Sequence, residues 1–154
     1  MKYIILHDIR SAYNVGAIFR TADGSGVEKV FLSGYTPTPT DRFGRTQAEI
    51  EKTSLGASAT MAWESVSSLP QLIADLKQQG VTVVAVEQSD KSVSLVSFRE
   101  PAHVAYIMGN ETEGIPPEIL AMVDVVVDIP MLGQKESLNV SVAAGVVLYH
   151  GVKQ

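Results

Sequence analysis

Three separated segments of this sequence combine glycine with polar side chains that could act on a bound ligand. They are residues 14–20, residues 109–114, and a third segment that runs from Ile129 through Met131 to Ser141. Each lies where a predicted strand gives way to a helix. Ligands of open α/β sheets bind at the carboxyl ends of the strands, and glycine lets the backbone approach a ligand closely. The three segments therefore predict one shared site.

The first segment contains the side chains with the most direct chemical use. Arg20 lies beside the apolar stripe of a predicted helix, so its guanidinium can reach solvent or a phosphate. Asn14 is predicted to be the N-cap of that helix. Taken alone, Asn14 is typical of an ordinary helix cap, and Arg20 is typical of a solvated arginine. A guanidinium with a pKa above about 12 is also a poor general base, so Arg20 is expected to bind and stabilise charge.

The elements that position these segments alternate between strand and helix. Apolar runs predict strands, and apolar residues at helical spacing predict the intervening helices. The pattern indicates an α/β fold with a mostly parallel sheet flanked by helices, in one domain covering residues 1–154. The predicted strands are 3–6, 30–32, 60–63, 81–86, 104–108 and 125–129, and the predicted helices follow Asn14 and span 48–52, 69–79, 116–122 and 137–149.

Composition excludes several classes of site. The chain has no cysteine, and its three histidines have no metal-ligand spacing, so we expect neither a disulfide nor a metal. It has no apolar run of about 18 residues and no signal peptide, so we expect a soluble cytoplasmic protein without a membrane segment. A net charge of −5 opposes nucleic-acid binding by bulk electrostatics, although most of the basic residues lie in the first third of the chain.

Together the three segments resemble the motifs of the SpoU (TrmH) branch of the SPOUT RNA methyltransferases, over nearly the whole chain. The resemblance implies a C-terminal deep trefoil knot that holds S-adenosylmethionine, and methyl transfer to a ribose 2′-hydroxyl of RNA. It also implies a homodimer with RNA sites across the interface. Arg20 would hold an RNA phosphate and stabilise the developing alkoxide.

The resemblance assigns roles to individual residues. Glu111 matches the carboxylate of the family's Gly-x-Glu-x-x-Gly element, and we expect it to support the loop by accepting hydrogen bonds from backbone N–H groups. The end of the predicted strand at residues 86–88 is expected to form another wall of the cofactor site. The implied catalytic residues are Asn14, Arg20, Ser137 and Asn139; the cofactor-binding residues are Val86, Glu87, Gly109, Ile129, Met131, Ser137 and Leu138; the RNA-binding residues are Arg20, Arg42, Arg45 and Lys52.

The substrate expected from the resemblance is tRNA, because the chain resembles the family's minimal members, without an N-terminal RNA-binding extension or a basic C-terminal tail. A ribosomal RNA 2′-O-methyltransferase is the alternative within the family. A non-catalytic RNA- or nucleotide-binding module on the same fold is a second alternative, motivated by the acidic charge. A dinucleotide-dependent oxidoreductase is disfavoured, because Gly24 and Gly26 follow a helix and not the first strand.

Overall fold

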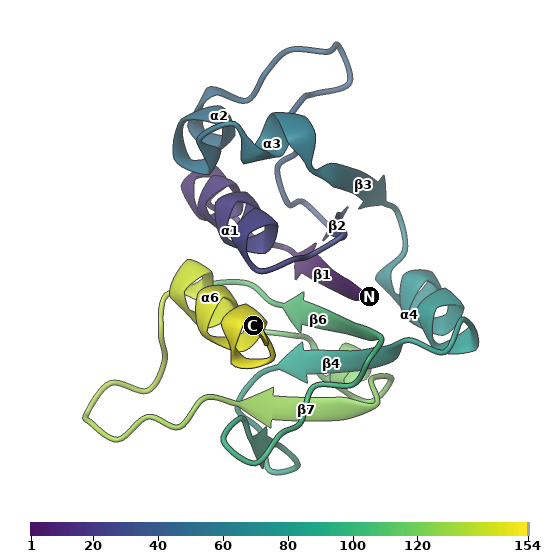
Figure 1. Cartoon of the computed structure of the whole chain (residues 1–154), viewed down its shortest axis with the longest axis vertical. Helices are drawn as coiled ribbons and strands as arrows, with labels where there is room; N and C mark the ends of the chain where they lie inside the picture. Colours follow the sequence, from purple (N-terminus) through teal and green to yellow (C-terminus); the bar gives the residue numbers. More distant parts are fainter. Residues whose placement is uncertain (154) are drawn as a thin grey trace.

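Seven strands form one sheet in which every neighbouring pair is parallel, in the order β3-β2-β1-β6-β4-β7-β5 (Figure 1). The computed structural model describes residues 1–153. The parallel sheet agrees with the fold class expected from the sequence. The strands are β1 (Lys2–His7), β2 (Lys29–Ser33), β3 (Ala62–Val66), β4 (Thr82–Val86), β5 (Val93–Ser94), β6 (Val104–Met108) and β7 (Val125–Asp128).

Helices cover both faces of the sheet. One face carries α1 and α6, which contact each other, and the opposite face carries α4 and α5. Within residues 1–153, no helix is both long enough and apolar enough to cross a membrane. The helices are α1 (Ala12–Gly24), α2 (Ala48–Ser54), α3 (Ala57–Thr60), α4 (Leu69–Gln78), α5 (Pro117–Leu120) and α6 (Val140–His150).

Two hydrophobic cores result from the alternation of side chains along the strands. Ile4 and Leu6 of β1 contribute to the core beneath α1 and α6, whereas Ile5 contributes to the core beneath α4. In β6, Tyr106 likewise belongs to the first core and Ile107 to the second. A parallel strand covered on both faces is apolar at successive positions, which explains the continuous apolar runs of the sequence.

The starts of three predicted elements are wrong by two residues or more. The N-cap of α1 is Ser11, whose Oγ accepts a hydrogen bond from the N–H of Asn14 at 3.2 Å, so the helix begins before Asn14. The strand expected at 60–63 begins at Ala62, because 57–60 forms α3. The closing helix begins at Val140, capped by Asn139, and residues 129–139 form no helix or strand. The short β5 and α3 were not predicted, since so few residues give no periodicity.

Because Ser11 caps α1, Ser11→Ala should lower the free energy of unfolding by about 1 kcal/mol in urea titration. The matched change Ser67→Ala removes a hydroxyl from an exposed residue next to the N-cap of α4, and it should change stability little. Equal effects of the two substitutions would contradict the assignment of Ser11 as the cap.

Candidate active site

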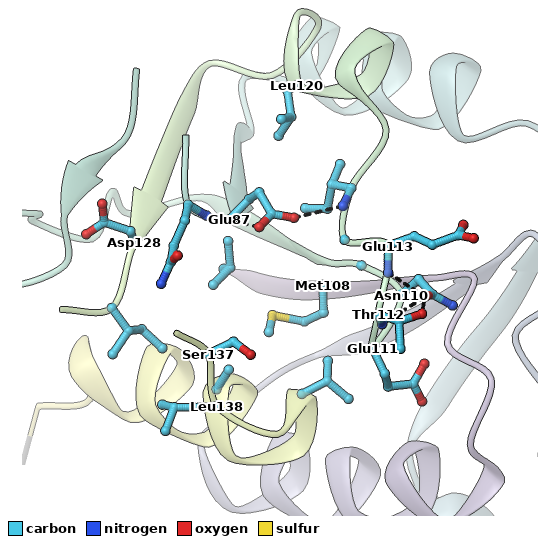
Figure 2. A pocket seen from close by; sticks show the side chains of 18 of the residues that line it. Glu87, Met108, Asn110, Glu111, Thr112, Glu113, Leu120, Asp128, Ser137 and Leu138 are labelled. Carbon is cyan, nitrogen blue, oxygen red and sulfur yellow. Dashed lines mark hydrogen bonds between the residues drawn. The ribbon is translucent and has the colours of Figure 1, made fainter. Parts of the chain in front are cut away.

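A cleft of about 470 Å³ lies at the carboxyl ends of three neighbouring strands, β6, β4 and β7 (Figure 2). Its walls are the residues that follow each strand, together with the loop before α6 and the start of that helix. A volume of this size is typical of sites for small molecules, which span about 300–1000 Å³. The parallel pairing of the strands therefore creates the site at the edge expected from the sequence.

All seven residues predicted to bind the cofactor line this one cleft. They come from four parts of the chain that are up to 52 residues apart, and Glu111 lines the cleft as well. The apolar members give the walls their hydrophobic character, and the polar members lie among them. The seven are Val86, Glu87, Gly109, Ile129, Met131, Ser137 and Leu138.

The loop after β6 is folded tightly on itself. Gly109 and Gly114 face each other, and a Cβ at Gly109 would lie 2.6 Å from the carbonyl carbon of Gly114. Gly114 has φ of +71°, which favours glycine. The absence of a side chain at Gly109 thus serves the closure of the loop, a role that differs from the direct cofactor approach expected from the sequence.

The side chains of Asn110 and Glu87 form hydrogen bonds with the backbone of this loop. Asn110 is buried, donates from Nδ2 to the carbonyl of Asp8 at 2.9 Å, and accepts at Oδ1 from the N–H groups of Thr112 and Glu113. Glu87, at the end of β4, accepts at Oε2 from the N–H of Ile115 at 2.9 Å. Figure 2 shows the bonds accepted by Glu87 and by Oδ1 of Asn110 as dashed lines. The loop is therefore ordered by bonds to its own backbone and to the ends of β1 and β4.

Glu111 connects the loop to the N-terminus of α1. Its Oε1 accepts from the N–H of Arg10 at 2.9 Å, and its Oε2 accepts from the N–H of Ser11 at 3.0 Å and from Nδ2 of Asn14 at 3.3 Å. Partial burial acts to raise the pKa of the Glu111 carboxyl, but these hydrogen bonds lower it below its ordinary value. A carboxylate at a helix N-terminus is also favoured by the helix dipole. Glu111 makes the backbone contacts that a supporting role requires.

The third predicted segment divides between two places. Ser137 and Leu138 line the cleft together with Met108 (Figure 2). Asn139 is not among the lining residues; its Oδ1 accepts from the N–H of Ser141 at 2.9 Å and so caps α6. Of Ser137 and Asn139, the two implied catalytic residues of this segment, the structure brings only Ser137 to the cleft.

The cleft is acidic. Its lining residues include four carboxylates and no lysine or arginine. Such a site favours a cationic or neutral ligand and disfavours a pyrophosphate, because like charges in a confined site repel each other. This electrostatic character argues against the dinucleotide-dependent alternative. The four residues are Glu87, Glu111, Glu113 and Asp128.

The first predicted segment reaches the cleft only indirectly. Asn14 is buried and contacts Glu111, but neither Asn14 nor Arg20 is among the lining residues. Arg20 lies two helical turns after Tyr13 on the exposed side of α1. The structure therefore does not bring Arg20 to the cleft of its own chain.

The other predicted RNA-binding residues are also away from the cleft. Arg42 and Arg45 lie in an exposed turn between β2 and α2, and Lys52 is exposed on α2. Their positions leave the cationic side chains on a different part of the surface from the acidic cleft.

Several lining residues were missed by sequence reasoning. Met108 ends β6, Leu120 ends α5, and Asp128 ends β7. The sequence predicts each of them only as part of a strand or helix. Met108 and Asp128 lie at the carboxyl ends of strands at this edge, a position that could have indicated them, whereas Leu120 ends a helix and has no such signal. Within residues 1–153, no cluster of three or more histidine and carboxylate side chains is arranged to hold a metal ion.

The model of the SpoU rRNA Methylase family matches residues 1–149. A curated relative, the 23S rRNA (guanosine-2′-O-)-methyltransferase RlmB of Neisseria meningitidis, is 35% identical over 145 residues. The match covers 94% of this chain and 55% of the relative, so the chain spans little more than half of the relative's length.

Solved structures share the fold. The AdoMet-bound rRNA methyltransferase from Sinorhizobium meliloti superposes with a TM-score of 0.84 at 26% identity, over 97% of this chain and 54% of that one. The A. aeolicus TrmH/SpoU tRNA modifying enzyme has a TM-score of 0.84 at 28% identity, over 97% of this chain and 72% of that one. The parallel sheet and its helices therefore match solved methyltransferase structures.

The lowered pKa of Glu111 predicts a pH-dependent contribution to stability. A carboxyl whose pKa is depressed by folding stabilises the native state above its unfolded value, here 4.5, and loses that contribution as the pH falls through the folded value. Glu111→Gln should therefore lower the free energy of unfolding by about 1 kcal/mol near neutral pH. The difference from the wild type should shrink below about pH 4.5 in denaturant titrations. A difference that is the same at about pH 7 and about pH 3 would refute the role of the charge.

Proposed function

The chain belongs to the SpoU rRNA methylase family, and on that premise we propose that it transfers a methyl group from S-adenosylmethionine to a ribose 2′-hydroxyl of RNA. The observation that carries the proposal is the convergence of the seven predicted cofactor residues on one cleft. The AdoMet-bound relative from Sinorhizobium meliloti supports the same cofactor. The trefoil knot stays a prediction, which the likeness in fold supports.

The chemistry of the cleft suits this cofactor. S-adenosylmethionine would supply a methyl group bonded to a sulfonium, whose positive charge lies on the sulfur next to the reacting carbon. The apolar walls of Met108, Ile129 and Leu138 suit the adenosyl group, and the carboxylates of the cleft favour the sulfonium and ammonium charges. Ser137 projects a hydroxyl toward this space and is proposed to orient a substrate oxygen.

Arg20 has the charge that the cleft lacks. Methyl transfer to a 2′-hydroxyl requires the loss of that proton and creates negative charge on the oxygen, next to a phosphate. We expect Arg20 to bind the phosphate and stabilise the developing alkoxide, while a phosphate oxygen or water accepts the proton. Asn14 then acts as a positioning residue through Glu111, and Asn139 positions Ser137 by capping α6.

A second copy of the chain is proposed to bring Arg20 to the cleft. Val142, Val146 and Tyr149 follow one another at helical spacing on the exposed side of α6, which packs beside α1. An exposed apolar face of this kind is typical of an interface. Because Arg20 is also exposed on α1, a homodimer through this face would place one chain's arginine at the interface. This arrangement explains why Arg20 is remote from its own cleft.

The proposed substrate is ribosomal RNA. The expectation of tRNA from the resemblance is not supported by the curated relative, which is named for 23S rRNA. tRNA is a second candidate, because the structurally similar A. aeolicus protein is a tRNA modifying enzyme. The cytoplasmic location expected from the sequence stays a prediction that either substrate supports.

Calorimetric titration with S-adenosylmethionine tests the cleft. Gly109→Ala should weaken binding about tenfold or more, because a Cβ there overlaps Gly114 and distorts the loop. Gly133→Ala is the matched control: it lies in the loop before α6, and a Cβ there meets no atom within 4 Å. Circular dichroism should show both variants folded. If both variants bind equally well, the loop after β6 is not a wall of the cofactor site.

Methyl transfer to fractionated RNA tests the reaction. The wild type should label ribosomal RNA from S-adenosylmethionine, and Arg20→Ala should lower the rate about a hundredfold or more while cofactor affinity stays the same. Labelling of tRNA alone would establish the second candidate. Cofactor binding without labelling of any RNA fraction would favour the non-catalytic module.

Mixing two inactive variants tests the shared site. Arg20→Ala provides an intact cleft, and Gly109→Val provides an intact Arg20. Mixed dimers should regain activity if the arginine acts on its partner's cleft. Failure to regain activity in dimers shown to be mixed would place Arg20 and the cleft in the same chain.

A further inference from the structure

The turn between β2 and α2 is ordered although its residues are exposed. Thr40 and Thr46 form an isolated antiparallel pair, and the N–H of Asp41 donates to the carbonyl of Arg45 at 2.9 Å. The N–H of Gly44 donates to the carbonyl of Asp41 at 2.9 Å, and Gly44 has φ of +78°. Residues 40–46 therefore form a closed hairpin turn, defined here as the Phe43 turn.

The carboxylate of Asp41 stabilises this turn from inside. It accepts from the N–H of Phe43 at 2.8 Å and from the N–H of Arg45 at 3.0 Å, and its second oxygen accepts from Nε of Arg45 at 2.7 Å. The bonds from the backbone and guanidinium of Arg45 lower the pKa of Asp41, so it is ionised at neutral pH. The Arg45 contact uses Nε and leaves the two terminal amino groups outside it.

Phe43 is presented at the tip of the turn with its side chain unburied. It is 67% exposed, and the guanidinium carbons of Arg42 and Arg45 lie 4.8 and 5.0 Å from its ring centroid. These distances are typical of cation–π contacts, which order the ring and both arginines together. The chain thus holds an aromatic surface and two cations in one preorganised group.

The chemistry of this group fits an unpaired nucleobase with its phosphates. Bases stack on phenylalanine rings and on guanidinium planes, and arginine binds phosphate. A duplex hides the faces of its bases, so the group favours single-stranded RNA. With a net charge of −5, the chain repels a polyanion over much of its surface, and binding must depend on local cationic groups.

The position of the turn is compatible with an RNA that also reaches the proposed site. The loop containing it leaves the carboxyl end of β2 and leads into α2, which packs against α1, the helix that carries Arg20. Figure 1 shows this loop in blue, extending beyond α2. We propose that the Phe43 turn is a stacking site for an unpaired RNA base near the modified nucleotide, an inference that rests on the proposed methyltransferase function.

Fluorescence anisotropy with a labelled single-stranded RNA of about a dozen nucleotides tests the stacking site. Phe43→Ala should weaken binding about tenfold, Phe43→Trp should keep it because the aromatic ring is retained, and Phe43→Leu should lose it. The same sequence as a blunt duplex should bind weakly to all four proteins. Because Phe43 is exposed, melting temperatures should be unchanged.

Salt dependence separates stacking from charge. Phe43→Ala should leave the slope of log affinity against log salt unchanged, whereas Arg42→Gln or Arg45→Gln should reduce it by about 0.7 each. Equal binding by wild type and Phe43→Ala, an equal loss on duplex RNA, or no binding of RNA by the wild type would overturn the proposal. The last result would favour a protein as the partner of this turn.

Parallel assays distinguish this inference from the proposed function. Wild type that binds S-adenosylmethionine and methylates RNA, with Phe43→Ala unchanged in single-strand affinity, would overturn the stacking site alone. Wild type that shows neither cofactor binding nor methyl transfer would overturn the proposed function. A tenfold stacking effect in that case would assign the turn to a binding module, and the placement beside a modified nucleotide would be wrong.

Discussion

The candidate site depends on the parallel pairing of β6 with β4 and of β4 with β7. Because parallel strands end at the same edge, residues that follow three different strands meet around one cleft. Burial of the sheet between two helical layers holds the strands in register, since a shift of one residue would move every apolar side chain to the other face. The core thus positions the site, even though few of the core side chains contact the cleft.

Loops at this edge are held by bonds between backbone N–H groups and a few polar side chains. Glu87 joins β4 to the loop after β6, and Glu111 joins the same loop to the N-terminus of α1. Each carboxylate accepts from backbone groups that would otherwise require water, so its charge is used in assembly as well as in the field of the cleft. This double use explains how an acidic cleft can be stable without a lysine or arginine among its lining residues.

Charge is distributed unevenly over the molecule. The cleft is lined by four carboxylates and no cation, while Arg20, Arg42 and Arg45 lie on other exposed parts of the chain. A small cationic cofactor and a large polyanion require opposite fields, and separating the two fields allows one protein to bind both. In the proposed homodimer, the interface would join these regions. Recognition of RNA would then combine a few local contacts with the shape of the assembly.

Sequence alone was sufficient for the α/β class, because apolar periodicity predicts buried strands. The family resemblance indicated seven residues that the structure brings to one cleft, because they lie at or after strand ends. The exact caps could not be predicted, since both Ser11 and Asn14 are good N-caps and only the packing of α1 against its neighbours selects Ser11. The role of Gly109 and the distance of Arg20 from the cleft are decided by contacts between residues far apart in the chain. Local sequence determined what each segment becomes; the tertiary structure decided which side chains meet, because that depends on long-range packing.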